Sequence, residues 1–380
     1  MERIEIKSDI LQWAVNRSGH KIKDLITHFP KLYNWIDGTE RPTLKQLEDF
    51  AAATKTPIGY LFLSYSPDVK LPIPDFRKSI SSRELPPTPD LIETIYLCQQ
   101  RQEWYRNFQQ SMGYEPLPFV GKVKLNSDIV HTAIEIRHTL GMDIDERRSS
   151  PTWTEALRRL ITQADEIGIL VMVNGVVGNN NHRKLDPQEF RGFALSDEYA
   201  PLVFINGADT KAAQMFTLAH EISHIWLGKS ALSDTEAFEI PNNDIEQWCN
   251  KLAAELLVPL EAIHKEYHKE TPLDEEINRL AKYFKVSTLV ILRRVYDAGY
   301  LNRNQMWDAY KEELQRLQRF SGGGGGDFYL TQIARVSRRF AKALVISTLE
   351  GQTLYTDAFQ LLGFSNIETF RNLGQRVGVF

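Results

Sequence analysis

A proline-rich stretch at residues 67–89 sets the strongest limit on how this chain can fold. It holds six prolines, from Pro67 to Pro89, and its apolar residues follow no helical period. Proline lacks a backbone N–H and fixes φ, so neither a long helix nor a central strand can run through the segment. We predict an extended linker here, with separately folded structure on either side.

The pattern before the linker predicts a small all-helical domain over residues 1–66. Short apolar runs are separated by turn signals such as Pro30 and Asp37-Gly38, and Ser8 is placed to cap the first helix. The expected helices cover residues 9–16, 21–27 and 31–36, and a fourth opens at Pro42-Thr43.

After the linker, a helical connector is predicted to complete the segment 67–150. From Leu91 to about Gly141 the apolar residues return to a helical period. The aromatic residues of this connector are expected in a core rather than against a ligand. They are Tyr96, Trp104, Tyr105 and Phe108.

Residues 151–300 combine helices with strands and so predict an α+β unit with a small sheet. Thr154 is expected to cap a helix, and three strands follow, two of them apolar runs and one, FRGFALS, with alternating polarity. The strands are IGILVMV, FRGFALS and APLVFIN. A long helix comes next, with Asp209 or Thr210 as its cap, and ends at Gly228.

The rest of the chain is predicted to be mostly helical. One helix covers residues 244–258 and stops at Pro259, and helices continue from Pro272 through a C-terminal region at 301–380. Five glycines at 321–327 interrupt that region. No strand precedes them and no Gly-Lys-Ser/Thr follows, so we expect a hinge rather than a phosphate-binding loop.

Composition narrows the classes of protein to which the chain can belong. Of 380 residues, 42% are hydrophobic and 25% charged, and no apolar run reaches 18 residues, which fits a globular rather than a membrane-spanning protein. No signal peptide is evident, so we expect a cytoplasmic protein with Cys98 and Cys249 as reduced thiols. A net charge of −4 argues against non-specific coating of nucleic acid.

The sequence TLAHEISHIWLG at residues 217–228 is the strongest chemical signal. His220 and His224 are four residues apart, about one helical turn, so both imidazoles project from the same face of the predicted helix. That spacing suits a zinc site. Glu221 is turned by roughly 100° from His220, beside the metal rather than on it, where it could act as general base and acid in hydrolysis.

A helical wheel places the two histidines opposite the large apolar residues of this helix. The small Ala213 and Thr217 lie on the histidine side, so an open pocket is expected above the imidazoles. The alternative is an amphipathic helix whose polar face matches the pattern by chance. A third ligand would decide between them, because catalytic zinc has three protein ligands and one open position.

Two glutamates in the helix 244–258 are candidates for the third ligand. Glu246 and Glu255 are nine residues apart and lie on opposite faces, so only one can reach the metal. We favour Glu246, because Asn250 shares its face and can support a ligand histidine, and because the small Ala253 permits close helix approach. The other glutamate is expected to be an ordinary surface charge.

Three further features are weaker candidates. The strand APLVFIN is placed to bind a substrate peptide beside the metal helix. His264 and His268 could donate to an oxyanion, but their charged neighbours favour a solvated helix face. His182, in the polar loop GNNNHRK, is a candidate for a lid that we do not favour.

Three separated blocks resemble the ImmA/IrrE family of metallopeptidases. They are EFRGFALSDEYAPLVFING, MFTLAHEISHIWLG and EQWCNKLAAELLVP, in the family's order, and they fall within residues 151–300. The resemblance implies a zincin-like fold with zinc bound by His220, His224 and a downstream glutamate, and with Glu221 as the catalytic carboxylate. It also implies one specific protein substrate, often a repressor or antitoxin-type regulator in a mobile element, stress response or toxin–antitoxin locus.

The N-terminal part resembles a XRE-type helix-turn-helix domain fused to such a peptidase. The resemblance rests on WIDGTERPTLKQLEDFAAATKTPIGYLFL and on PIPDFR, which recurs in the fused subgroup. In the segment HFPKLYN, only Lys31, Tyr33 and Asn34 are placed to contact DNA, and Pro30 lies near the expected start of the recognition helix. Residues 1–60 carry nine basic and eight acidic side chains, a weak balance for neutralising phosphates, so a protein-interaction domain is the alternative.

Two functions follow from these features. The first is a regulatory zinc-dependent metallopeptidase that cleaves a specific partner protein. The second is a non-catalytic antitoxin or transcriptional regulator that binds a cognate toxin, operator DNA or both, with a structural or vestigial metal site. Both functions expect a protein partner, and a homodimer is compatible with either.

Overall fold

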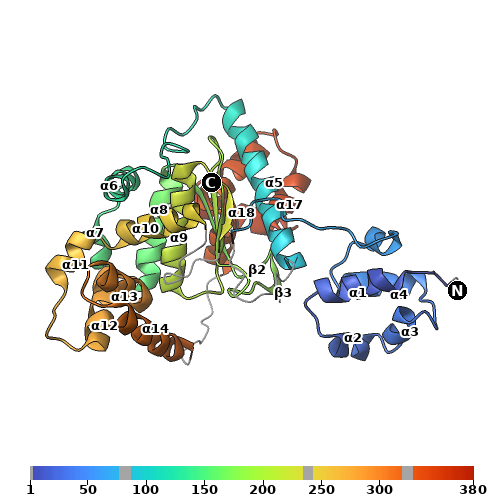
Figure 1. The fold of residues 1–380 in the computed structure, drawn as a ribbon. Helices are drawn as coiled ribbons and strands as arrows, with labels where there is room; N and C mark the ends of the chain where they lie inside the picture. Colours follow the sequence, from blue (N-terminus) through green and yellow to red (C-terminus); the bar gives the residue numbers. More distant parts are fainter. Residues whose placement is uncertain (1–2, 77–86, 234–242, 319–327) are drawn as a thin grey trace. The chain divides into compact units, whose positions relative to one another are not determined.

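The computed structural model describes residues 3–76, 87–233, 243–318 and 328–380, and it divides the chain into two compact units (Figure 1). Unit 1 comprises residues 1–72 and 79–96, and unit 2 comprises 73–78 and 97–380. The division into four parts at residues 66, 150 and 300 is finer and stays a prediction.

Unit 1 is a small bundle of short helices around its own core. Buried side chains at its centre include Leu11, Trp35 and Phe50. The rings of Trp35 and Phe50 meet edge to face at 6.4 Å, a favoured arrangement for aromatic pairs. The elements are α1 (Ser8–Arg17), α2 (Ile22–His28), α3 (Leu32–Ile36), α4 (Leu44–Ala53) and a 3-10 helix (Ile58–Phe62).

The predicted starts of two helices in unit 1 have different outcomes. Thr43 caps α4, and its capping box with Gln46 explains why a helix opens there. The prediction that Ser8 caps α1 was wrong, because Lys7 is the N-cap residue and Ser8 already lies in the helix. The Ser8 hydroxyl instead donates to the carbonyl of Ile36 at the end of α3, where helical carbonyls lack a partner within the helix.

Unit 2 is built around a mixed four-stranded sheet with helices on both sides (Figure 1). The strand order is β1-β5-β4-β6; β5 pairs in parallel with β1, and β4 runs antiparallel to β5 and β6. A separate hairpin is formed by β2 and β3. The strands are β1 (Leu170–Asn174), β2 (Val176–Val177), β3 (Asn180–Lys184), β4 (Gly192–Leu195), β5 (Leu202–Asn206) and β6 (Ala231–Ser233).

The strand order corrects one functional prediction. The run APLVFIN forms β5, which lies between β1 and β4, so both of its edges are already hydrogen-bonded to neighbouring strands. Its proposed role as the exposed strand that binds a peptide was therefore wrong. The strand at the end of the order next to β4 is β6, which the apolar pattern of the sequence does not predict.

Helices make up most of unit 2, and the predicted fold class, mostly helical α+β, is confirmed. No described helix is both long and apolar enough to cross a membrane. The predicted glycine hinge at 321–327 lies outside the described residues. The helices are α5 (Pro89–Ser111, starting in unit 1), α6 (Ile129–Leu140), α7 (Ile144–Arg148), α8 (Trp153–Glu166), α9 (Lys211–Leu227), α10 (Asp244–Leu257), α11 (Leu260–Glu266), α12 (Leu273–Phe284), α13 (Thr288–Asp297), α14 (Arg303–Gln318), α15 (Phe328–Val336), α16 (Arg338–Leu349), α17 (Tyr355–Leu362) and α18 (Ile367–Val377).

Three local predictions differ from the observed helices and strands. Thr152 rather than Thr154 caps α8. The sequence GNNNHRK lies largely in β3 rather than in a loop, and its His182 is exposed. α11 ends at Glu266, so His264 and His268 do not share a helix face, although both are exposed as expected.

Two further predictions concern buried side chains, and they have different outcomes. Cys98 and Cys249 are free and buried. Of the connector's aromatic residues, Tyr105 is buried, whereas Tyr96 is 49% exposed and so lies outside the core. Gln102, near the middle of α5, donates to the carbonyls of Leu195 and Ala200 at 2.9 and 2.8 Å, which ties this helix to the end of β4.

Candidate metal centre

The helix α9 carries the histidine pair and is fixed at both ends. Thr210 caps its start by accepting a hydrogen bond from the Ala213 amide at 3.2 Å. At its end Gly228 adopts a left-handed conformation with φ of 66°, and the Gly121 amide donates to the Ile225 carbonyl at 3.0 Å. A Cβ at Gly228 would lie 2.9 Å from the Cα of Gly121, so this close approach requires glycine.

The histidines of α9 are buried rather than open to solvent. His220, Glu221 and His224 each have an exposed fraction of 0%, and α9 is buried continuously from Gln214 to Leu227. The predicted open pocket above the imidazoles was therefore wrong. The physical reason is that α9 packs against β4 and β5 and also against α10, whereas a helical wheel identifies only the more apolar face.

Three predicted ligands meet at one point between α9 and α10. The Nε2 atoms of His220 and His224 are 3.1 Å apart. The two carboxylate oxygens of Glu246 lie 3.2 Å from His220 Nε2 and 3.0 Å from His224 Nε2. These three residues form the one group among the described residues whose ligand atoms lie close enough together to hold a metal ion.

The spacing of these atoms fits zinc. Zinc lies about 2.0–2.1 Å from histidine nitrogen and carboxylate oxygen, so ligand atoms in a tetrahedral site are roughly 3.3 Å apart. The three measured separations are 3.0, 3.1 and 3.2 Å. Two nitrogens and one carboxylate are also a donor set that zinc enzymes use, with the fourth position left for water or substrate.

The ionisation of the cluster also suits a cation. Burial lowers the pKa of His224, which favours the neutral imidazole that a metal needs. Burial would raise the pKa of Glu246, but the adjacent imidazoles of His220 and His224 hold that pKa well below its ordinary value. The site thus presents an anionic carboxylate beside the imidazole of His224.

Glu221 lies beside this cluster in a dry environment. Burial, reinforced by the negative charge of Glu246, raises the pKa of the Glu221 carboxyl well above its ordinary value. The nearby Ser233 hydroxyl offsets only part of this rise, and by distance and angle neither Glu221 oxygen has a hydrogen-bond partner among the described residues. A buried carboxyl with a raised pKa is a stronger base than an exposed one, which suits a group that takes up and releases a proton during hydrolysis.

Two residues that the sequence did not single out shape the site. Gly192 in β4 faces α9, and a Cβ there would lie 2.6 Å from Thr217 Cγ2 and 3.3 Å from Glu221 Oε1. Ser233 at the end of β6 has its hydroxyl 3.4 Å from His224 Nε2 and 3.5 Å from Glu246 Oε1. A glycine inside a predicted strand is a signal of close approach, whereas nothing in the sequence marks Ser233.

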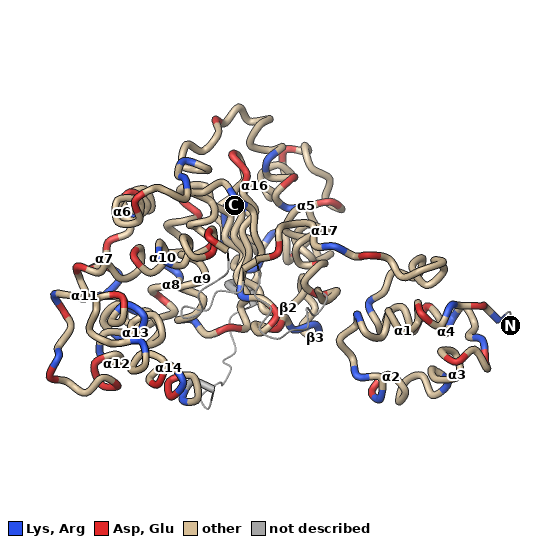
Figure 2. The backbone as a smooth tube through the Cα atoms, in the orientation of Figure 1, with Lys and Arg blue, Asp and Glu red and all other residues tan. Residues whose placement is uncertain are grey.

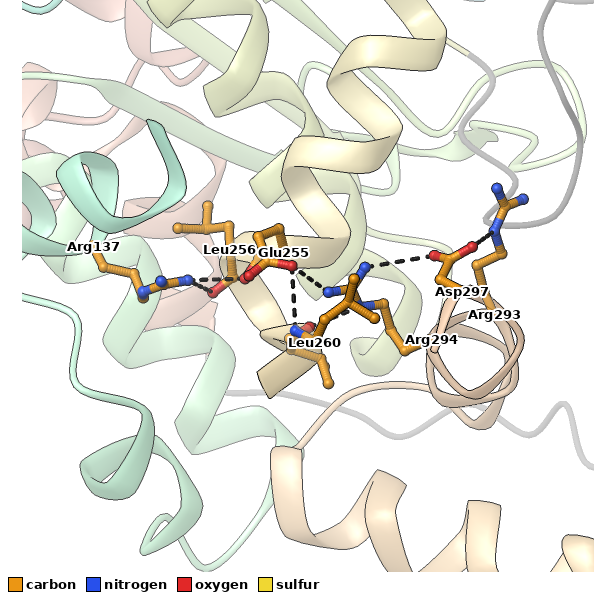
Figure 3. Close-up of polar contacts among 8 residues, drawn as sticks. Arg137, Glu255, Leu256, Leu260, Arg293, Arg294 and Asp297 are labelled. Carbon is orange, nitrogen blue, oxygen red and sulfur yellow. Dashed lines mark hydrogen bonds and ion pairs between the residues drawn. The ribbon is translucent and has the colours of Figure 1, made fainter. Parts of the chain in front are cut away.

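The second glutamate of α10, Glu255, has a structural role (Figure 3). Its carboxylate forms an ion pair with Arg294, whose side chain is 4% exposed, and accepts a hydrogen bond from the Leu260 amide at 3.3 Å. Glu255 itself is 4% exposed, so the expectation of an ordinary surface charge was wrong. Arg294 from α13 supplies the counter-charge for this buried carboxylate.

Three arginines close the C-terminal end of α10, the helix that carries Glu246. Arg137 donates to the Glu255 carbonyl at 2.8 Å, Arg294 donates to the Val258 carbonyl at 2.7 Å, and Arg147 bonds the Leu257 carbonyl (Figure 3 shows the first two side chains). Cationic side chains at the C-terminal end of a helix donate hydrogen bonds to its free carbonyls and interact favourably with the negative end of its dipole. The position of α10 is therefore held from the end opposite Glu246.

In the part of the chain that it describes, the structure shows no hydrogen bond that would let Asn250 support a ligand histidine in the predicted way. Its Oδ1 atom has no hydrogen-bond partner among the described residues, and neither does Nδ1 of His220 or of His224. In most zinc sites that second ring nitrogen donates to a carboxylate or a carbonyl. Support of a ligand histidine by Asn250 stays a prediction.

The residues predicted to contact DNA lie in and beside α3 of unit 1. Lys31 pairs with Glu40 at 2.8 Å, Tyr33 is 51% exposed, and the Asn34 carbonyl accepts from the Glu40 amide at 3.0 Å. α3 has five residues. In the described part of unit 1, basic and acidic residues are interspersed along the backbone (Figure 2).

Comparison with known proteins finds two matching protein families. Residues 164–296 match a peptidase family described as the IrrE N-terminal-like domain. Residues 336–376 match a domain of unknown function. A comparison with curated proteins finds no significant match. The first match includes α9 and α10 and supports the peptidase part of the resemblance; neither match reaches unit 1.

Proposed function

We propose that this protein is a zinc-dependent metallopeptidase that hydrolyses a peptide bond in one specific partner protein. The observation that carries the proposal is the cluster of His220, His224 and Glu246 with the unpartnered carboxyl of Glu221 beside it. The match of residues 164–296 to a peptidase family supports the same activity. A zinc ion held there would supply a Lewis acid for the attacking water and the scissile carbonyl.

In this proposal Glu221 moves the proton. Its carboxylate accepts the proton that the attacking water loses and later delivers it to the amine of the departing peptide. The raised pKa that burial gives Glu221 suits both steps. His220, His224 and Glu246 hold the ion, and Ser233 is close enough to orient the Glu246 carboxylate.

The partner in the proposal is a regulatory protein. The resemblance to the ImmA/IrrE family supports this, because its members commonly act on one repressor or antitoxin-type regulator. We place the protein in a toxin–antitoxin, mobile-element or stress-response locus on the same basis. The test is to co-express the chain with the protein encoded beside it.

A second function is favoured by the depth of the site. With His220, Glu221 and His224 each 0% exposed, a metal ion at this position could be purely structural. The protein would then be an antitoxin or transcriptional regulator that binds its partner without cutting it. Burial supports this alternative because a catalytic site must admit substrate.

Co-expression of the partner with wild type and with two variants, Glu221→Gln and His220→Ala, separates these functions. For a peptidase, wild type shortens the partner, while Glu221→Gln binds it intact. For a binding protein, wild type and Glu221→Gln form the same complex with an uncut partner, and His220→Ala loses it with the metal site. A partner that is neither cut nor bound by wild type contradicts both proposals.

Operator binding by unit 1 is a further proposal, supported by the resemblance of its sequence to XRE-type domains. The expected affinity is low, because Lys31 is already paired with Glu40 and each neutralised phosphate adds to a salt-dependent attraction. We expect Lys31→Ala to weaken binding to the chain's own promoter DNA and to reduce its salt dependence, measured by fluorescence anisotropy. Wild type that fails to bind at low salt contradicts this proposal and leaves protein recognition as the role of unit 1.

A further inference from the structure

The outer edge of β6 is covered by a distant piece of the same chain. The Leu232 amide donates to the Pro74 carbonyl at 3.0 Å, and the Phe76 amide donates to the Leu232 carbonyl at 3.0 Å. These bonds make a parallel bridge between Asp75 and Leu232. Residues 73–76, called the edge segment below, therefore continue the sheet beyond β6 within unit 2.

The edge segment also lies against the candidate metal centre. The ring of Phe76 stacks on the imidazole of His224, with centroids 6.4 Å apart and planes at 28°. Ser233, the residue after Leu232, has its hydroxyl 3.4 Å from His224 Nε2. Leu232 therefore holds the main chain of the edge segment, and the Phe76 side chain of that segment covers His224, a proposed metal ligand.

This arrangement is the one that an added peptide strand would adopt. A peptide that extends a sheet forms main-chain bonds to the edge strand and places side chains against the surface beside it. The edge segment uses the amide and the carbonyl of Leu232 for those bonds and packs Phe76 as the side chain. Since one amide and one carbonyl serve both, a substrate peptide and the edge segment exclude each other at Leu232.

We propose that the outer edge of β6 is the peptide-binding edge of this centre, and that the edge segment occupies it as an internal competitor. The inference rests on the proposed function, because it assigns regulation and substrate class to the same site. The partner is an extended peptide that pairs with Leu232 and presents an aromatic side chain to His224. Its binding displaces residues 73–76 from β6.

The sequence of the edge segment suits a contact that can be released. Pro74 has no N–H, so the segment cannot donate to a strand at that position. Pro74 and Asp75 are exposed, and Ile73 is buried. The main-chain bonds to β6 are made at Leu232 alone, and the Phe76 ring lies on His224 of α9, so a longer partner strand can form more main-chain bonds to β6.

A binding measurement tests the competition without turnover. The full-length Glu221→Gln protein loaded with zinc is titrated into a labelled peptide of sequence LPIPDFRK, which corresponds to residues 71–78. Adding Phe76→Ala removes the ring, and adding Phe76→Pro also removes the amide that bonds Leu232. Each should tighten peptide binding about tenfold or more, the scale of one or two lost contacts.

The matched control is Tyr65→Ala, which removes an aromatic ring that is 80% exposed earlier in the connecting region. Its peptide affinity should equal that of the parent protein. Equal affinity in all four proteins would overturn the proposal. So would weaker binding after Phe76→Ala, because Phe76 would then contribute to the site instead of blocking it.

Hydrogen exchange at the Leu232 amide supplies a second readout. In the parent protein this amide is bonded to Pro74 and should exchange slowly; in both Phe76 variants it should exchange about tenfold faster. Unchanged protection of α9 amides in the same samples shows that the variants are folded. Leu232 exchange that stays at the parental rate in both variants contradicts the proposal.

The two levels of inference fail separately. If Phe76 variants gain peptide affinity but wild type cuts no peptide bond, the peptidase proposal fails and the peptide-binding edge stands. If wild type cuts its partner and the Phe76 variants neither gain affinity nor expose Leu232, the peptidase stands and the internal competitor is rejected.

Discussion

At the residue scale, Gly192 sets how closely α9 can approach the sheet beside Glu221. A Cβ there would lie 2.8 Å from the Phe204 carbonyl oxygen, a backbone atom of the neighbouring strand, and 2.6 Å from Thr217 Cγ2. Side-chain rotation cannot relieve these contacts, because the first is to a backbone atom and the second is to the short, branched side chain of Thr217. Strand and helix would have to separate, and Glu221 would move with the helix.

We therefore expect Gly192→Ala to lower the free energy of unfolding by roughly 1–3 kcal/mol, as overpacked cores do, and to reduce partner cleavage. Urea denaturation measures the first effect. Gly59→Ala is the control, because a Cβ at Gly59 meets no atom within 4 Å. Equal stability of Gly192→Ala and wild type would contradict this packing.

The two thiols give a second test at this scale. Burial raises the pKa of Cys98 to about 12 and raises that of Cys249 well above its ordinary value. Because only the thiolate reacts, native protein should resist iodoacetamide at pH 8, and both thiols should react in denaturant. Labelling of either cysteine in native protein at the rate of a free thiol would show that its surroundings are open.

Sequence reasoning at the residue scale found the cluster of side chains and missed its depth. The i,i+4 spacing of His220 and His224 and the choice of Glu246 over Glu255 agree with the cluster in the structure. Their burial could not be predicted, because it depends on α10 and the sheet enclosing α9. Phe76 and Ser233 were missed for a similar reason, since only tertiary contacts bring them to the histidines.

At the element scale, α10 assigns different tasks to its two glutamates. Glu246 in its first turn faces His220 and His224, and Glu255 in its last turn pairs with Arg294. One helix therefore connects the metal cluster to a buried ion pair, and its two ends can be tested independently.

Glu255→Gln should destabilise unit 2 by about 3–5 kcal/mol, because Arg294 would remain buried without its counter-charge. The folded fraction should still bind zinc, since the cluster is intact. Glu246→Gln should have the opposite pair of effects: it should lose zinc, and the free energy of unfolding of the metal-free protein should change little. Thermal unfolding in the presence of a chelator compares the two variants, and similar stability would contradict the role given to Glu255.

Strand and helix types were easier to predict than their arrangement. The apolar runs that became β1, β4 and β5, the cap at Thr210 and the stop at Gly228 were all readable from local patterns. The order β1-β5-β4-β6 was not, because sequence periodicity carries no information about which strands pair. Because strand pairing could not be predicted, APLVFIN was wrongly predicted to be an exposed edge strand.

At the scale of the whole molecule, the chain has two units with separate cores. The core of unit 1 includes Leu11, Trp35 and Phe50, and that of unit 2 includes Leu218, Trp226 and Leu252. All three proposed metal ligands belong to unit 2. Metal binding should therefore stabilise one unit alone.

Calorimetry should resolve two unfolding transitions, because each unit has its own core. Removal of zinc with a chelator should lower the midpoint of the unit 2 transition by several degrees, since a ligand that binds only the folded state stabilises it. The unit 1 transition should not move. A shift of both transitions, or of neither, would contradict the assignment of the site to unit 2.

Zinc content per chain tests the central claim most directly. Purified wild type and Glu221→Gln should each carry about one zinc ion, the number that one cluster of three ligands holds. His220→Ala and Glu246→Gln should carry well under one. Wild type that stays far below one zinc per chain after reconstitution, or Glu246→Gln that keeps a full equivalent, would contradict the account.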